Sequence, residues 1–422
     1  MGAYLLDWAA MLTRWLHFIA GVAWIGASFY FIWLDNSLKA PTDPDLQKKG
    51  VSGELWAVHG GGFYNPQKYM VAPATLPADL HWFKWEAYTT WISGFLLLTW
   101  VYYFNASAYL VDQNVLAMSP GTAIGISLGV LAFGWVIYDV MCRVFGKADK
   151  ALAIFGFVLL IVAAWGLAKV FNARAAYLHV GAMIGTMMAA NVLMVIIPGQ
   201  RRVVEAMKRG EKPNPEDGRR AKQRSVHNNY LTLPVLFIMV SNHFPMTYQH
   251  PRAWLVLAVI MVAAVMIRHF FNLRHKGKVV IALPLTAAGL FLALIIAMAP
   301  SQDAEADVGP PPTLEEVHSV IGLRCARCHA KKPSFPGLLV APQGLIFEDA
   351  AVIEANHERI YKQVVETEAM PQGNITKMTE DERNLIGRWC RYMKNRKPGE
   401  AVPPPPTDAP PAPGEQPQPA GD

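Results

Sequence analysis

Eight long apolar runs constrain the fold of this 422-residue chain more than any other feature of its sequence. Each is about 20 residues long, the length that an α-helix needs to cross roughly 30 Å of hydrocarbon. Because backbone amides in lipid must find partners within their own segment, we expect every run to be helical. The runs cover residues 15–37, 85–104, 122–144, 151–171, 176–198, 230–248, 253–271 and 279–299.

The composition agrees with a membrane protein. Apolar residues make up 53% of the chain, more than an ordinary soluble domain carries. The formal charge of +6 is modest, and Lys and Arg gather in blocks between the runs, so we expect a lipid bilayer and no nucleic acid as partner. Four cysteines are too few for a disulfide framework. The first run passes Gly21 and Gly26 without a cleavage site, which predicts a retained helix instead of a signal peptide.

Loop charges predict the orientation. The segment "GQRRVVEAMKRGEKPNPEDGRRAKQRS" after the fifth run is the most basic block, and basic loops stay in the cytoplasm. The loops "CRVFGKADK" and "RHFFNLRHKGK" agree, whereas "NASAYLVDQNVLAMSPG" has no Lys or Arg and is expected outside. Alternation then predicts a multi-pass protein of the bacterial inner membrane with both termini in the periplasm. The cytoplasmic loop 38–84, with "HGGGFYNPQKY", is predicted to be an irregular connection.

The predicted fold class is therefore all-α, a polytopic bundle of eight transmembrane helices followed by a small soluble α-helical domain. The openings "WLHFIAGVAWIGASF" and "YLHVGAMIGTMMAAN" lie four runs apart and share an aromatic, a Leu and a His, which predicts a 4+4 repeat. Composition divides the chain at residue 300. The predicted parts are a membrane domain at 1–300, a Pro-rich linker at 301–312, a soluble domain at 313–397 and a disordered Pro-rich tail at 398–422.

The soluble domain contains the pattern C-x-x-C-H at Cys325, Cys328 and His329. Two cysteines at this spacing can form thioethers to one haem c, and the adjacent His can bind its iron, so we predict a cytochrome c domain. Met370 precedes a proline, which disfavours helix there, and is the predicted second axial ligand, with Met378 as the alternative. A zinc site would need partner ligands, and a thioredoxin-like pair would need a βαβ surround; neither context is present.

Histidines inside the apolar runs are the other candidates for iron ligands. His17, His179 and His243 are predicted at similar depth near the outer face. If two of these histidines bind the iron of a haem b, that haem would serve as an electron relay. The alternative is that each histidine forms a hydrogen bond between helices. His227 is predicted at the cytoplasmic edge with Glu86, Asn228 and Asn229, in either a polar substrate pocket or an interfacial belt.

The segments "WLHFIAGVAWIGASFYFIWLDNSL", "YLHVGAMIGTMMAANVLMVIIPGQR" and "HNNYLTLPVLFIMVSNHFP", followed by a cytochrome c motif, resemble the membrane-bound urate oxidase (urate hydroxylase) family. The resemblance implies oxidation of urate to 5-hydroxyisourate in purine degradation. It also implies that electrons pass through the fused cytochrome c to the respiratory chain, by way of a downstream cytochrome c or terminal oxidase. A shorter similarity of the first run to membrane protoporphyrinogen oxidases supports His17 as a haem ligand.

Given this resemblance, an anionic purine must find a polar site among the helices. The rival interpretation is an electron-transfer module that carries electrons from quinol or a partner dehydrogenase to periplasmic acceptors. The candidate substrate-binding residues are Glu86, Arg174, Asn191, His227, Asn228, Asn229 and Asn242.

Overall fold

A computed structural model describes residues 2–70, 73, 75–146, 148–299, 311–335, 338 and 340–396. The chain divides into two compact units, Met1–Pro300 and Ser301–Asp422. Most of the predicted linker, residues 301–310, and the predicted tail at 398–422 lie outside the described residues.

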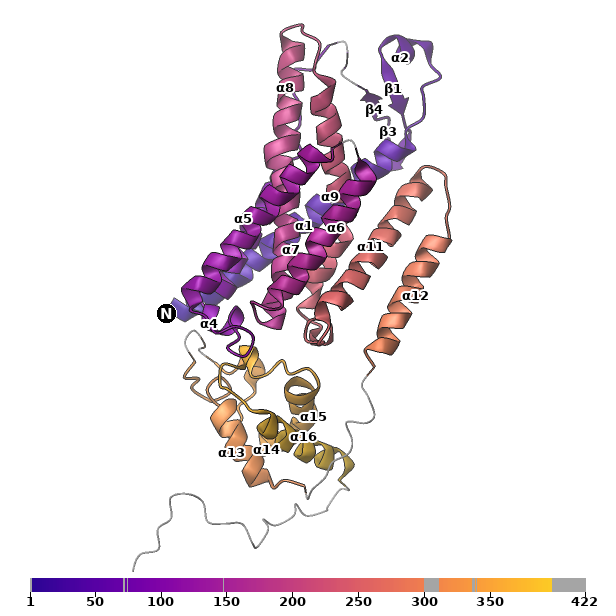
Figure 1. The fold of residues 1–422 in the computed structure, drawn as a ribbon. Coiled ribbons are helices and arrows are strands. Elements are labelled where there is room, and N and C mark those ends of the chain that lie inside the picture. The colour runs from indigo at the N-terminus through magenta and orange to yellow at the C-terminus, as the bar shows by residue number, and fades with distance from the viewer. Residues whose placement is uncertain are drawn as a thin grey trace, which may run out of the picture. The chain divides into compact units, whose positions relative to one another are not determined.

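Each of the eight apolar runs is helical over most of its length in the first unit (Figure 1). The short helices α2 (Pro44–Lys48), α4 (Ala106–Tyr109) and α10 (Pro245–Tyr248) lie between the long ones. The long helices are α1 (Gly2–Ser37), α3 (Trp85–Leu97) with the π-helix η1 (Leu98–Tyr103), α5 (Pro120–Val144), α6 (Asp149–Leu167), α7 (Ala173–Ala190) with the π-helix η2 (Asn191–Ile196) and α8 (Ile197–Lys208), α9 (Pro215–Ser241), α11 (Ala253–His275) and α12 (Ala282–Ala297).

Five helices among the described residues are long and apolar enough to cross a membrane. They are α1, α5, α6, α11 and the continuous helix from α7 to α8. The other three predicted spans lie in helices that are shorter or more polar. The α-helical part of α3 has 13 residues, α12 has 16, and α9 begins within the basic segment that follows α8.

Local sequence explains where several long helices begin. The side chain of Asn172 accepts a hydrogen bond from the backbone of Ala175 at the start of α7. Ser119 caps α5 and Asn214 caps α9 in the same way, and each is followed by a proline in the first turn. These residues satisfy backbone N–H groups that have no partner within the helix.

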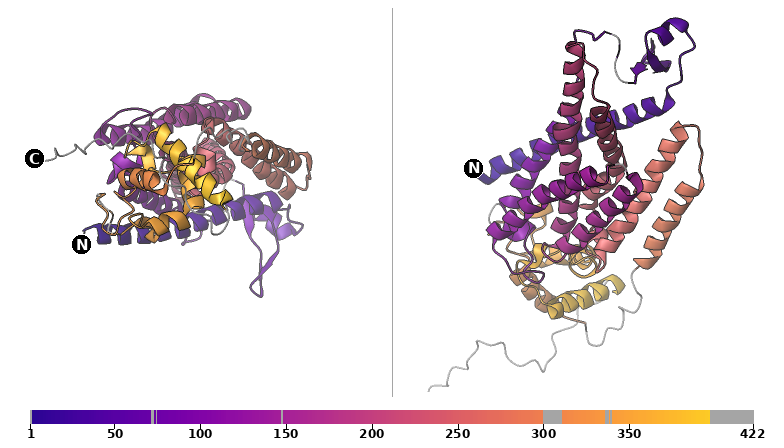
Figure 2. Two further views of the ribbon diagram at one scale, coloured as in Figure 1. Left: turned by 90° about the horizontal axis from the view of Figure 1, so that it is seen from below. Right: turned by 45° about the horizontal axis from the view of Figure 1, so that its top comes forward.

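The sequence suggested that the loop 38–84 is an irregular connection. The structure instead contains four short strands in the described part of this loop. Strands β2 (Ala57–His59) and β3 (Gly62–Tyr64) form an antiparallel hairpin, and β1 (Val51–Glu54) pairs antiparallel with β4 (Gln67–Tyr69). Gly60 and Gly61 make the hairpin turn with positive φ of 57° and 80°, a conformation that favours glycine. This segment lies at the same end of the unit as α8 (Figures 1 and 2).

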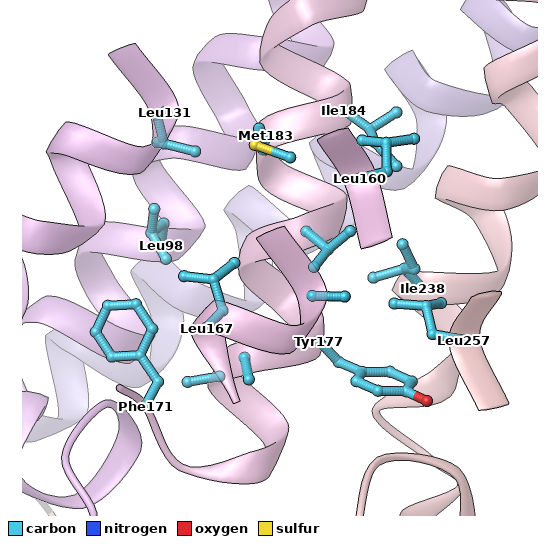
Figure 3. Packing of buried hydrophobic residues seen from close by; sticks show 14 of the residues in the cluster. Leu98, Leu131, Leu160, Leu167, Phe171, Tyr177, Met183, Ile184, Ile238 and Leu257 are labelled. Carbon is cyan, nitrogen blue, oxygen red and sulfur yellow. The ribbon is translucent and has the colours of Figure 1, made fainter. Parts of the chain in front are cut away.

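The core of the first unit surrounds α7, which packs against α3, α5, α6, α9 and α10. Figure 3 shows side chains from several of these helices meeting, among them Leu131, Met183 and Ile238. The α7 and α9 backbones approach closely at Gly181, where an added Cβ would lie 2.6 Å from the Cγ2 atom of Ile238. Small residues at such crossings are typical of helices packed in membranes.

The second unit is also helical. Capping boxes begin α13 (Leu314–Arg324) at Thr313 and α16 (Glu380–Asn395) at Thr379. The two helices pack together and are joined by hydrogen bonds of 2.9–3.0 Å from Arg324 to Glu382. The remaining helical segments are η4 (Pro342–Gly344), α14 (Ala350–Ala355), α15 (His357–Tyr361), η5 (Lys362–Glu366) and η6 (Gln372–Asn374).

Candidate functional site

The C-x-x-C-H motif forms a tight turn directly after α13. Helix α13 ends at Arg324, and the backbone N–H groups of Cys328 and His329 both donate to the carbonyl oxygen of Cys325, at 3.1 and 2.9 Å. No disulfide joins the two cysteines. Burial raises the pKa of the Cys325 thiol to about 12, whereas the attacking thiol of a thioredoxin-like pair has a lowered pKa.

The orientation of His329 fits an iron ligand. Its Nδ1 donates to the carbonyl oxygen of Leu345 at 3.1 Å, and its ring packs on Phe347 with centroids 4.9 Å apart. A backbone carbonyl can only accept, so the ring proton is on Nδ1 and the lone pair is on Nε2. A metal-binding imidazole is usually oriented in this way, by a hydrogen bond from the ring nitrogen that does not bind the metal. Within the described residues no group of three or more His, Cys, Asp or Glu side chains could hold a zinc ion at the motif.

Met370 lies in a non-helical segment after η5, as its proline neighbour predicted. Its backbone is held at both ends, because its N–H donates to the Gln363 carbonyl at 2.9 Å and Arg383 donates to its carbonyl at 2.9 Å. The Met370 side chain is half-buried against the apolar cluster of this unit, and Met378 is buried within that cluster.

Two buried donors in this unit also fit a bound haem c. Trp389 is fully buried, and neither its indole Nε1 nor the hydroxyl of Thr376 has a protein partner. A buried donor without a partner costs stability. Haem carries two propionate groups, which are strong acceptors, so Trp389 and Thr376 match chemistry that haem would bring. With Cys325, Cys328 and His329, the residues of this unit fit covalent haem c.

The axial-ligand prediction can be tested by replacing Met370 with Ala. We expect the far-red sulfur-to-iron charge-transfer band of the ferric protein to disappear and the haem midpoint potential to fall, because thioether ligation raises that potential. Absorption spectra and a potentiometric titration measure both effects. Met378→Ala is the matched control and should keep the band. Loss of the band in Met378→Ala, with the band retained in Met370→Ala, would assign the ligand to Met378.

The three histidines proposed for haem b lie in different surroundings. His179 donates from Nδ1 to the Ala175 carbonyl at 2.7 Å, so its Nε2 accepts from Ser127 at 2.6 Å. Neither nitrogen of His179 is free to bind iron in this arrangement. His17 donates from Nδ1 to the Thr90 carbonyl at 2.9 Å, which leaves Nε2 as its acceptor, and His243 is exposed after α9. The membrane haem stays a prediction from the sequence.

A buried polar network joins α5, η2 and α9. The Asn191 amide donates to Asn228 at 2.8 Å and to the Tyr138 hydroxyl at 3.1 Å. The Tyr138 hydroxyl in turn shares a hydrogen bond of 2.7 Å with Nδ1 of His227. The structure thus brings three predicted candidates together: Asn191, His227 and Asn228.

Within this network the buried charge of Arg224 is paired with the carboxylate of Asp139. Arg224 donates to Asp139 at 2.6 Å, and the two side chains are only 5% and 12% exposed. Arg143 also donates to Asp139 at 2.7 Å. Arg224 reaches Asn191 at 3.3 Å and packs over the ring of Tyr138. Because its charges and amides have partners, this cluster, which we call the Arg224 network, holds the helices together without needing a bound molecule.

The other candidates do not join the Arg224 network. Arg174 donates to Asn242 at 3.1 Å, and Asn229 accepts from Nε of Arg268 at 2.6 Å. Glu86 is half-buried in the first turn of α3. The sequence interpretation missed four residues of these clusters. The missed residues are Tyr138, Asp139, Arg224 and Arg268. For Tyr138, Asp139 and Arg268 the available signal was a charged or hydroxyl side chain inside an apolar run, whereas Arg224 lies in the basic segment before the sixth run.

Comparison with known proteins concerns the first unit. The family model described as "Urate oxidase N-terminal" matches residues 3–299. The match ends one residue before the boundary between the two compact units. No curated protein and no solved structure matches the chain.

Proposed function

Because the chain belongs to the urate oxidase N-terminal family, we propose that it is a membrane oxidoreductase that converts urate to 5-hydroxyisourate. Electrons would leave through a covalent haem c on the C-terminal unit and reach a downstream cytochrome c or terminal oxidase. One observation carries this proposal: the family match to residues 3–299 is followed, in the same chain, by a C-x-x-C-H turn with a correctly oriented His329.

The proposed membrane topology supports this route. All eight helices that contain the apolar runs would cross the bacterial inner membrane, including α3, α9 and α12. The basic segment between α8 and α9 would then lie in the cytoplasm, and an even number of crossings would place both termini in the periplasm. Haem c is attached in that compartment in bacteria.

The reaction is an oxidation with addition of water. Urate and one water give 5-hydroxyisourate, two protons and two electrons, and the new oxygen bonds to C5. Haem c would supply a one-electron acceptor, so two successive transfers are needed for each urate. Cys325 and Cys328 would hold the porphyrin, while His329 and Met370 would bind the iron. Combined His and Met ligation gives a high potential, which favours acceptance of electrons.

The test compares two reductants under anaerobic conditions, using the purified full-length protein with its haem oxidised. We expect urate to reduce the haem at a rate that saturates with urate concentration, and 5-hydroxyisourate to appear in proportion. Reduction by a quinol alone, with no reaction with urate, would instead identify the protein as an electron-transfer module. Absorption at the α-band and chromatography of the purines measure the two outcomes.

A further inference from the structure

One face of α11 carries buried polar atoms without protein partners. Arg268, Asn272 and His275 follow one another at intervals of four and three residues, so their side chains lie on the same face of the helix. The atoms concerned are Nη2 of Arg268, Oδ1 of Asn272 and Nδ1 of His275. In the described part of the first unit, the one other buried side-chain atom of this kind is Oε1 of Gln249.

Arg268 is the centre of this group. The residue is 4% exposed, its Nε donates to Oδ1 of Asn229 at 2.6 Å, and its guanidinium lies 3.9 Å from the centroid of the Phe29 ring. Helix α11 thus holds this cation against α9 and α1. Among the described residues no carboxylate forms an ion pair with Arg268, whereas the buried Arg224 is paired with Asp139.

An amide and an aromatic ring orient a guanidinium but do not neutralise it. A buried charge with no counter-charge is strongly destabilising, and natural proteins retain one mainly where it acts on something. The buried atoms without partners indicate which hydrogen-bonding groups a bound molecule must have. Nη2 of Arg268 needs an acceptor and Oδ1 of Asn272 needs a donor. A small anion with an anionic oxygen beside an N–H group provides both.

We propose that Arg268 and Asn272 bind the urate anion, with Asn229 holding the Arg268 guanidinium in place. Urate is a monoanion at neutral pH and carries carbonyl oxygens next to ring N–H groups. Arg268 supplies the counter-charge, Asn272 accepts a ring N–H, and Asn229 positions the guanidinium. This assignment rests on the proposed function, because it takes urate as the anion. It also distinguishes two arginines: Arg224 stabilises the helix bundle, while Arg268 binds substrate.

The experiment measures urate binding and urate oxidation separately on the full-length protein in detergent. Equilibrium dialysis with labelled urate gives the Kd, and anaerobic haem reduction gives KM and kcat. Replacing Arg268 by Gln should raise both Kd and KM by about 10- to 100-fold, the usual effect of losing a charge-assisted hydrogen bond. Arg268→Lys keeps the charge and should recover part of the loss. Arg274→Gln, an exposed arginine on the same helix, is the matched control and should change neither constant.

Asn272→Asp provides a second test should Arg268→Gln fold poorly. The new carboxylate would neutralise Arg268 and repel the anion, so Kd and KM should again rise. Values within twofold of wild type in the folded variants would overturn the assignment, even if urate still reduced the haem. If wild-type protein binds urate through Arg268 but its haem stays oxidised, the site stands and the proposed oxidation fails. If wild-type protein neither binds nor oxidises urate, both proposals fail.

Discussion

Replacing both Cys325 and Cys328 by serine is expected to abolish covalent haem attachment and, with it, urate-driven electron transfer to the C-terminal unit. The expected loss follows from the chemistry of the two side chains. The turn after α13 presents both thiols, and a serine hydroxyl cannot form a thioether to a haem vinyl group. Haem-dependent peroxidase staining after denaturing electrophoresis should fall to background. The pyridine haemochrome spectrum of the full-length protein should lose its c-type band.

Cys390→Ser is the control for this pair. Cys390 is buried in the same apolar cluster but lies outside the motif, so its replacement should leave covalent haem in place. Covalent haem that persists in the double variant, or disappears in Cys390→Ser alone, would contradict the assignment of the motif.

The second large effect is expected at Asp139. Replacing it by Leu should destabilise the first unit by about 3–5 kcal/mol, because Arg224 would remain buried without its counter-charge. The measurement is the denaturant dependence of unfolding of the purified protein in mixed micelles. The double variant Asp139→Leu with Arg224→Met should recover most of the loss, since no unpaired charge then remains.

Asp45→Asn is the matched control for Asp139. Asp45 pairs with Lys48 at 3.5 Å on the surface, where both side chains are more than three-quarters exposed, so its loss should cost less than about 1 kcal/mol. Equal losses of stability in Asp45→Asn and Asp139→Leu would contradict a structural role for the Arg224 network.

Helices could be predicted from the sequence where an apolar run long enough to cross a membrane marked them. The apolar run at 253–271 predicted α11 closely, and the structure extends it only to His275. The first half of α9 could not be found in this way, because its residues are polar and no apolar run covers them. The strands in the loop 38–84 were also missed. Strands of three or four residues have almost no alternation to read, although the glycines at positions 60 and 61 did signal a turn.

The candidate site residues also fall into two groups: those that the sequence alone identifies, and those that only helix packing brings together. Cys325, Cys328 and His329 lie within five residues of the chain, so their chemistry can be read from spacing alone. Asp139 and Arg224 are 85 residues apart, and Asn229 and Arg268 are 39 apart. Sequence can flag a charge inside an apolar run, but only helix packing decides which charge receives a counter-charge. Arg224 lies in a basic segment and Arg268 in an apolar run, but only the structure shows that Arg224 is paired with Asp139.

The measurement closest to the central claim is an anaerobic titration of the oxidised full-length protein with urate. With one haem c in each chain, two chains should be reduced for every urate consumed, and one 5-hydroxyisourate should form. The oxygen at C5 should come from labelled water. Haem that stays oxidised, or product that forms only when O₂ is admitted and contains its oxygen, would contradict the account.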